Sequence, residues 1–487
     1  MVGDLVEPWK CPNMIFCILS EIAKKMQEPI ILTCYLQEGG CCFWECLELI
    51  KLAEQPEPTS KVMTDDVTNP ASWHWAKKFA FRFFFVYLLL YCFPFPLDSF
   101  DFIKPIARPY YQFLDWLIPA VGNRWFHIHA VPRFDMFDKF DDSGYGLVFI
   151  YLNLVGSLFA ALIWSFIDRN SKNYDTANQW LRLYLRFFLA AFLFGYGFNK
   201  WFPSQFQPIT ASRLTMTVGD QSPMLLAWNF MGYSVTMMKI NGAIELLAAV
   251  LLIFRRTATL GAIISAGIFG FVVLMDFSFN VPVRLLASHL LFISILLALQ
   301  DAERLVNVLV FNRATTPAVY APLILHPLGR KIFNGVLGLL AVCLLYTSMI
   351  NGLNAQKEFG YYIEKPPLYG VYRTVYFLRN TDTIPPLGTD SLRWKQLVID
   401  GTSFEQSAKI EFSNDKTFLC MVKADTTNHI LHLKLENDNS RFQYSFPDSN
   451  HILIRGRWKE DSIEVFMNKF DLNNYLLHRE QFKWINQ

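Results

Sequence analysis

Long apolar runs between residues 79 and 350 constrain the fold of this chain more than any other feature of its sequence. The segment 143–167, for example, contains no charged side chain. A helix needs about 20 apolar residues to cross the hydrocarbon core of a bilayer. We therefore predict an integral membrane protein with an α-helical bundle of about seven spans. The predicted spans are residues 79–97, 145–167, 180–199, 235–254, 258–276, 282–300 and 332–350.

The amino-acid composition also distinguishes the chain from a soluble protein. Charged residues make up 18% of its 487 residues, whereas an average soluble domain has about 25%. The formal net charge is +2, so the chain lacks the strong basic field that attracts nucleic acid. The expected partner is the lipid bilayer, and no nucleic acid is expected.

Basic residues mark every second loop between the predicted spans. Lys77 and Lys78 precede the first span, and Arg255 and Arg256 separate the fourth from the fifth. Because short loops rich in Lys and Arg stay in the cytoplasm, we predict a cytoplasmic N-terminus and, after seven spans, an extracytoplasmic C-terminal domain. The expected location is the cell (inner) membrane. Other basic residues on the predicted cytoplasmic side are Arg169, Lys172, Arg304, Arg313, Arg330 and Lys331.

Three further arginines, Arg82, Arg182 and Arg186, lie inside the predicted spans but near their ends. A long basic side chain can extend from such a position to the membrane surface. We therefore interpret these arginines as interfacial anchors.

Residues 1–62 differ from the rest of the chain. They contain six of its nine cysteines but no long apolar run. Cys41, Cys42 and Cys46 lack the second ligand pair of a zinc module, so no metal site is predicted there. We expect a poorly ordered N-terminal extension, and Met63, shortly before the first span, is an alternative start of the protein.

From about Glu358 onward the hydrophobic period changes to two. Residues 430–435 and 452–456 alternate in this way, and turn residues such as those at 414–415 separate the segments. Such segments recur roughly every ten residues, which predicts an antiparallel all-β domain at 358–487, a lipocalin-like barrel or a sandwich. An interior ligand pocket and a filled core are the two alternatives for this domain.

Five segments carry a resemblance to a known family. They read GYGFNK at 195–200, GDQSPM at 219–224, NGAIELL at 241–247, RRTATLGA at 255–262 and NVPVRLLASH at 280–289. In this order and spacing they resemble the bacterial DoxX-like family of four-helix membrane proteins. The resemblance covers about residues 178–315, a little over a quarter of the chain.

The resemblance implies a domain order and a function. Two spans with an extracytoplasmic loop occupy 63–177, the DoxX-like four-helix domain occupies 178–315, and a linker with the seventh span occupies 316–357. The outer-loop segment 141–145 matches the family pattern only in part. Members of the family are associated with membrane redox complexes. The resemblance therefore implies a component of envelope redox or quinone-linked metabolism that acts with partner subunits, with a quinone as the implied ligand.

Six ionisable residues are predicted to gather in the outer leaflet of the bundle. At about 1.5 Å of helical rise per residue, Glu245 and His289 lie at similar depths below the outer surface. Ionisable groups inside spans are costly and often functional. The six candidates are Glu245, His289, Asp276, Arg284, Lys200 and Lys239.

Three hypotheses are open for this group. In the first, Glu245 pairs with a cation and holds the helices together. In the second, the group lines a pocket for a quinone or a similar small molecule, and Glu245 or His289 hydrogen-bonds the ligand or relays protons. In the third, the group forms part of an ion path.

A second candidate site is the His-x-His pair of His127 and His129, to which Asp135 and Asp138 could add oxygen ligands. An ordinary exposed loop is the alternative, and no metal is predicted. The sequence contains no dinucleotide fingerprint, phosphate loop or nucleophile elbow, so no catalytic residue is predicted. Alternative functions are a non-enzymatic envelope scaffold, a ligand-binding protein acting through the β domain, and a carrier of small solutes or ions.

Overall fold

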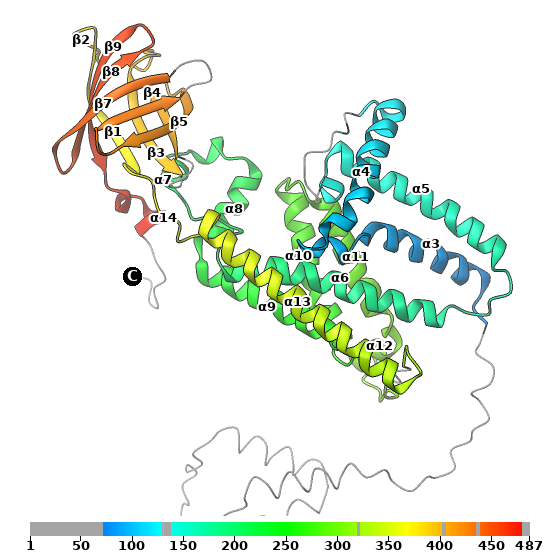
Figure 1. Ribbon diagram of the computed structural model, residues 1–487. Helices are drawn as coiled ribbons and strands as arrows, with labels where there is room; N and C mark the ends of the chain where they lie inside the picture. The colour runs from blue at the N-terminus through cyan, green and yellow to red at the C-terminus, as the bar shows by residue number, and fades with distance from the viewer. Residues whose placement is uncertain are drawn as a thin grey trace, which may run out of the picture. The chain divides into compact units, whose positions relative to one another are not determined.

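The computed structural model describes residues 72–128, 130, 138–318, 322–401, 406–434 and 439–479 (Figure 1). These residues form a helical part and a β domain within one compact unit, 71–487. The predicted extension, 1–62, lies outside the described residues.

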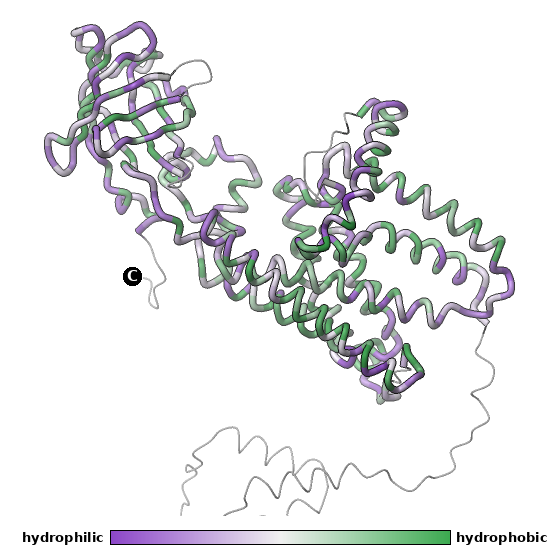
Figure 2. The backbone as a smooth tube through the Cα atoms, in the orientation of Figure 1, coloured by the Kyte–Doolittle hydropathy of each residue, from purple (hydrophilic) through white to green (hydrophobic). Residues whose placement is uncertain are grey.

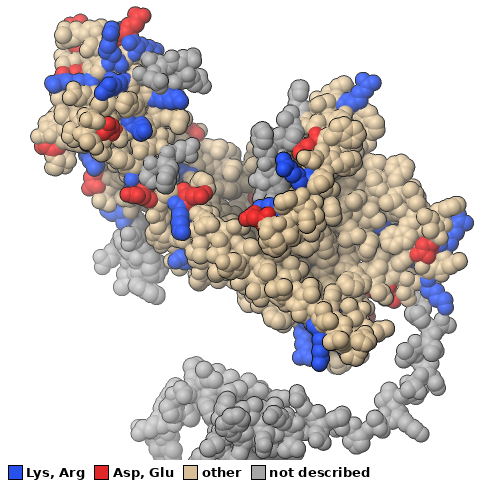
Figure 3. Space-filling model, viewed as in Figure 1, with Lys and Arg blue, Asp and Glu red and all other residues tan. Residues whose placement is uncertain are grey.

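Long apolar helices stand where spans were predicted, which confirms that several segments can cross a membrane. They are α3 (Trp75–Cys92), α5 (Gly144–Ile167), α6 (Asp175–Trp201), α9 (Val235–Ile253), α10 (Ala258–Ser278) and α13 (Pro327–Phe359). Their mid-sections are apolar, whereas hydrophilic residues gather at the helix ends and in the β domain (Figure 2). On the face shown in Figure 3, the sides of the helical part carry few charges. Such a surface suits contact with lipid.

The sixth predicted span differs from the others. α11 (Arg284–Leu299) has 16 residues and is followed, after a bend of 76°, by α12 (Ala302–Leu309). At 1.5 Å per residue α11 is about 24 Å long, slightly less than the roughly 30 Å hydrocarbon core of a bilayer. The two helices meet the length and hydropathy of a span only when they are taken together, although the bend means that α12 adds little to the distance crossed.

Contacts at its two ends show that α11 runs the length of the bundle. Its first backbone amides bond to Asp142, just before α5 begins. Asp301, just after its last turn, lies 3.9 Å from the guanidinium of Arg182, near the start of α6. Because α5 and α6 are consecutive antiparallel spans, their starts lie at opposite ends of the bundle. α11 therefore crosses from one end to the other.

The loop predicted over 98–144 contains a helix, α4 (Lys104–Val121), that the sequence analysis did not predict. Pro109 and Pro119 lie inside it, and proline normally ends a helix. Here one face buries Leu114 and Ile118, and the resulting packing outweighs the weak local preference. The Tyr145 hydroxyl of α5 donates to Asp115 at 2.9 Å and fixes this helix to the bundle.

The C-terminal domain is an antiparallel eight-stranded β-barrel, so the barrel alternative is confirmed over the sandwich. Each strand pairs with its neighbours in chain order, and β1 also pairs with β9, which closes the barrel. A short strand, β2 (Asp382–Thr383), only extends the edge of β1. The barrel strands are β1 (Gly370–Arg379), β3 (Trp394–Gly401), β4 (Gln406–Phe412), β5 (Thr417–Asp425), β6 (Ile430–Lys434), β7 (Asn439–Asp448), β8 (His451–Trp458) and β9 (Asp461–Phe470).

Large side chains fill the barrel interior. Trp394, Phe442 and Trp458 are all buried, and the Trp394 ring lies edge-on to both others, with centroids 5.8 and 5.3 Å away. Buried apolar residues from every barrel strand complete one cluster around them. An eight-stranded barrel is just wide enough for its side chains to fill it. The interior therefore supports the filled-core interpretation and gives no support to a ligand pocket within the barrel.

The loop after α6 packs on the barrel. A short helix, α7 (Ala211–Leu214), begins where the amide of Ala211 donates to the Tyr369 hydroxyl and that of Ser212 donates to Asp400, both at 2.9 Å. Residues 212 and 400 thus lie on the same side of any membrane. If α9, α10 and α13 each cross a membrane, α11 must cross it as well, because an even number of spans has to separate these two residues.

Candidate functional site

The first polar contact among the predicted site residues is a buried ion pair between α6 and α9. Lys200 Nζ donates to Oε1 of Glu245 at 2.7 Å and to Oε2 at 2.9 Å. The two side chains are 8% and 6% exposed. The Tyr196 ring lies 5.4 Å from the same ammonium group. Both carboxylate oxygens are therefore already engaged by one cation.

Two glycines bring these helices close enough for the pair to form. A Cβ on Gly242 would lie 2.7 Å from the Gly197 carbonyl oxygen, a distance that real Cβ atoms do not adopt. Lys200 and Glu245 each follow their glycine by three residues, so they lie on the same faces as the glycines. Small residues at a helix crossing are a common means of close packing in membranes.

The second contact holds the beginning of α11. Asp142 accepts bonds from the backbone amides of Arg284 and Leu285 at 3.0 and 2.9 Å, and from Arg284 Nε at 2.7 Å. A carboxylate in this position accepts hydrogen bonds from amides that have no partner within the helix. Its negative charge also interacts favourably with the positive end of the helix dipole. Asp276 is within electrostatic range of Asp142 and Arg284. It is 2% exposed, and its Oδ2 has no hydrogen-bond partner among the described residues.

The third contact links α11 to α3 through His289. The Nδ1 of His289 lies 2.7 Å from the Leu285 carbonyl oxygen, and the Nε2 lies 2.6 Å from the Tyr87 hydroxyl. Because a carbonyl can only accept, Nδ1 carries a proton, and in the neutral imidazole Nε2 accepts from Tyr87. The Tyr91 ring stacks on the imidazole with centroids 4.1 Å apart. His289 is only partly buried, so this imidazole–phenol pair borders the surface of the bundle.

Buried polar atoms without partners lie on the helices that pack beside this pair. They are the Tyr91 hydroxyl, the Asn153 side-chain oxygen and the Ser157 hydroxyl, none of which bonds to a described residue. The Asn153 amide nitrogen donates to the Tyr87 carbonyl at 3.2 Å. Unpaired polar groups in an apolar interior are expected to bind water or a ligand.

The six predicted residues therefore occupy separate contacts. The structure joins Lys200 to Glu245, places Asp276 near Arg284, and pairs His289 with tyrosines of α3. Lys239 is half-buried on α9 and forms no ion pair within the described part of the chain. Tyr87, Tyr91 and Asp142 were not among the predicted residues, although two tyrosines spaced by four residues in an apolar span were a visible signal.

The proposed metal ligands are mostly beyond what the structure describes. His127 is exposed, with φ of 53°, whereas His129, Asp135 and the side chain of Asp138 lie outside the described residues. Among the residues that are described, no group of three potential ligands is close enough to hold a metal ion.

Comparison with known proteins gives one significant relationship to a curated sequence. The chain is 33% identical over 123 residues to the uncharacterized protein YwoB of Bacillus subtilis. This match covers 25% of the chain and 78% of YwoB. No protein-family model matches the chain, and no solved structure matches it significantly.

Proposed function

The chain belongs to the same protein family as YwoB, and from that premise we propose that it is a DoxX-like membrane component of quinone-linked redox metabolism. It acts with partner subunits that carry the electrons. Its N-terminus lies in the cytoplasm and its barrel lies outside the cell (inner) membrane.

The contact between His289 and Tyr87 carries this proposal. Reduction of a quinone takes up two electrons and two protons, so its site needs a group that donates hydrogen bonds and moves protons. An imidazole whose ordinary pKa is near 6.5 suits this role. His289 Nε2 and the Tyr87 hydroxyl bond to each other at 2.6 Å, and His289 is only partly buried. A quinone that enters here would replace this bond, and its carbonyl oxygen would accept from the Tyr87 hydroxyl or from a protonated Nε2.

Glu245 has a different role in this proposal. Both of its oxygens bond to Lys200, and the glycines beside the pair bring α6 and α9 into close contact. The pair therefore holds the bundle together, and the quinone site centres on His289. These same contacts favour a second candidate function, a scaffold that binds no small molecule.

Quinone binding to the full-length protein tests the two candidates. Protein purified in a mild detergent is extracted and assayed for bound quinone by chromatography, and its melting temperature is measured with and without a short-chain quinone. We expect His289→Gln and Tyr87→Phe each to weaken binding about tenfold, because one hydrogen bond is worth about 1.4 kcal/mol. Ser288→Ala is the control at the neighbouring position.

The scaffold function makes the opposite prediction. Wild-type protein would then carry no quinone and would not be stabilised by one, and this result would reject the proposed redox role. Loss of bound quinone from Ser288→Ala as well as from His289→Gln would also contradict a specific site at His289.

A further inference from the structure

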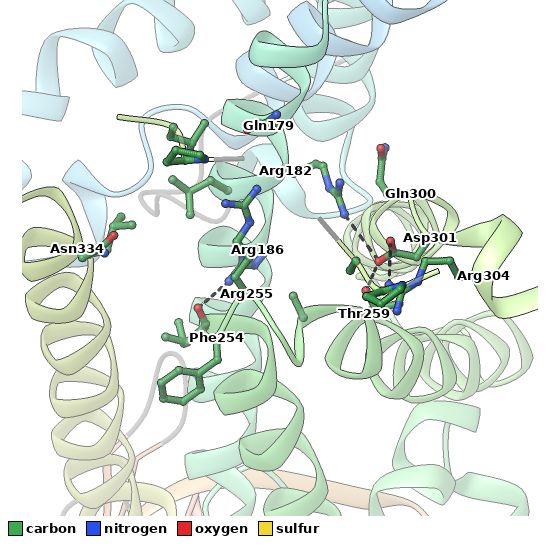
Figure 4. A pocket seen from close by; sticks show the side chains of 18 of the residues that line it. Gln179, Arg182, Arg186, Phe254, Arg255, Thr259, Gln300, Asp301, Arg304 and Asn334 are labelled. Carbon is green, nitrogen blue, oxygen red and sulfur yellow. Dashed lines mark hydrogen bonds and ion pairs between the residues drawn. The ribbon is translucent and has the colours of Figure 1, made fainter. Parts of the chain in front are cut away.

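A large cavity lies at the end of the bundle opposite Asp142. Its volume is about 1080 Å³, comparable to the largest small-molecule sites. The beginning of α6, the turn between α9 and α10, the bend between α11 and α12, and the beginning of α13 all contribute to its lining. Figure 4 shows side chains from these separate elements converging on it. The quinone site proposed above uses none of them.

Positive charge dominates this cavity. Five arginines line it against two acidic residues, Asp301 and Glu303, which leaves a surplus of three positive charges. Two guanidinium groups approach the same carboxylate (Figure 4): a terminal nitrogen of Arg182 lies 3.9 Å from one oxygen of Asp301, and a terminal nitrogen of Arg304 lies 3.7 Å from the other. Thr259 also donates to Asp301. The five arginines are Arg182, Arg186, Arg255, Arg304 and Arg330.

One of the five arginines has a structural task. Arg186 is 8% exposed, and it donates from Nε to the Leu252 carbonyl at 2.8 Å and from a terminal nitrogen to the Ile253 carbonyl at 2.6 Å. These carbonyls end α9, so the guanidinium caps the helix and offsets its dipole. Arg186 therefore holds the end of α9 in place in the cavity wall. The other four arginines supply the remaining positive charge of the cavity.

Arg304, which lines the cavity, has one donor that no described residue accepts. Its Nε is buried and has no hydrogen-bond partner among the described residues. A buried donor without a partner is unfavourable, and more so when it belongs to a charged group. An anion bound in the cavity would remove this cost and offset the surplus charge.

The neighbouring helix indicates what carries the anion. α12 bends by 76° from α11 and buries none of its residues. Val306, Leu309 and Phe311, on or just after it, are exposed apolar residues, and Arg304 and Asn307 of the same helix line the cavity. A helix that leaves a span at such an angle lies close to the membrane plane, where an apolar face contacts acyl chains.

We propose that this cavity binds a phosphate group, and that the ligand is an anionic phospholipid whose headgroup enters between the arginines while its chains lie along α12. Guanidinium groups hold phosphate through pairs of charge-assisted hydrogen bonds. Basic pockets between spans on the cytoplasmic side are suited to acidic headgroups. A soluble phosphate would use the same arginines without the apolar helix.

The test compares two double variants with the same change of charge. Arg255→Gln with Arg330→Gln removes two cavity arginines. Arg256→Gln with Lys331→Gln removes the neighbouring basic residues, which do not line the cavity. Full-length protein in neutral detergent is titrated separately with phosphatidylglycerol, phosphatidylcholine and inorganic phosphate, and bound ligand is counted by native mass spectrometry.

We expect phosphatidylglycerol to bind the wild type more tightly than phosphatidylcholine does. The cavity variant should lose at least tenfold in affinity, and the neighbouring variant should bind as the wild type does. Binding of inorganic phosphate alone, with the same dependence on the cavity arginines, would retain the phosphate site and assign it to a soluble ligand. Equal weakening in both variants, or no preference for an anion, would overturn the proposal. Melting temperatures of both variants identify any loss that results from unfolding.

Discussion

Removing one member of the Lys200–Glu245 pair should destabilise the bundle far more than removing both. The pair is almost fully buried, with both oxygens of Glu245 within 2.9 Å of one ammonium nitrogen. Three substitutions probe it: Lys200→Met, Glu245→Gln, and the two combined. Lys239→Met is the matched control, because Lys239 is a half-buried lysine of α9 with no ion pair in the described part of the chain.

The expected magnitudes follow from burial and charge. Breaking a buried pair by removing one partner costs about 3–5 kcal/mol, since the remaining charge has lost its counterion. After Lys200→Met, the Glu245 carboxylate has no counterion but can become neutral by taking up a proton. Protonating an ordinary carboxyl group at pH 7 costs about 4 kcal/mol, so this value limits the loss of stability. After Glu245→Gln, the amide oxygen still accepts from Lys200, so we expect about 3 kcal/mol. The double variant retains no buried charge and should lose about 1 kcal/mol.

Equilibrium unfolding in detergent micelles measures these differences. The chain has 13 tryptophans, so their fluorescence can follow unfolding as a denaturing detergent is added to a mild one. The double-mutant cycle should give a coupling energy of several kcal/mol between the two positions. Lys239→Met should change the free energy of unfolding by less than about 1 kcal/mol. Additive losses in the double variant would refute a stabilising role for the pair.

Three further predictions concern other parts of the chain. Residues 358–487 expressed alone should melt cooperatively and give a β-type circular dichroism spectrum, because the barrel has its own filled core; a disordered fragment would contradict this. A reporter that is active only in the cytoplasm, fused after Gln487, should be silent, and a bright signal would reverse the proposed topology. Burial lowers the pKa of Lys139 from 10.5 to about 8, so the unfolded state holds this proton more tightly and stability should rise with pH between those values. Melting temperatures of the wild type and Lys139→Met at pH 7 and pH 10 test this. The variant should be stabilised relative to the wild type more at pH 7 than at pH 10, and an equal shift in melting temperature at both pH values would contradict the prediction.

The spans and strands could be predicted because they depend on local pattern. Apolar length located the membrane helices, and the alternation of apolar residues at 430–435 and 452–456 located β6 and β8. α4 was not predicted. It contains Pro109 and Pro119, and its packing against the bundle overrides their tendency to end a helix. Arg82 was expected to extend to the membrane surface. Instead it is buried and donates to the Tyr174 hydroxyl and the Asp168 carbonyl, because a nearby helix end offers it acceptors.

The partners of the site residues could not be predicted in the same way. An ion pair for Glu245 was one of the hypotheses, but its choice of Lys200 depends on how α6 and α9 are rotated about their axes. The partner of His289 is further removed, since Tyr87 lies 202 residues earlier in the chain. The basic cavity was not predicted, because its arginines come from separate loops and helix ends, where they were interpreted only as markers of orientation or as interfacial anchors.

Closure of the barrel through β1 and β9 has a consequence for how the domain is attached. Val371 is the register partner of Phe470, and antiparallel partners lie about 5 Å apart, so the chain enters and leaves the barrel at one place. All other neighbouring strands follow chain order. A circular permutant that joins residue 470 to 370 and opens the turn at 413–416 would keep every pairing. The barrel can thus be transferred between proteins as a unit by gene fusion. It can also be attached through a different pair of strands, and in both cases the register of its strands stays the same.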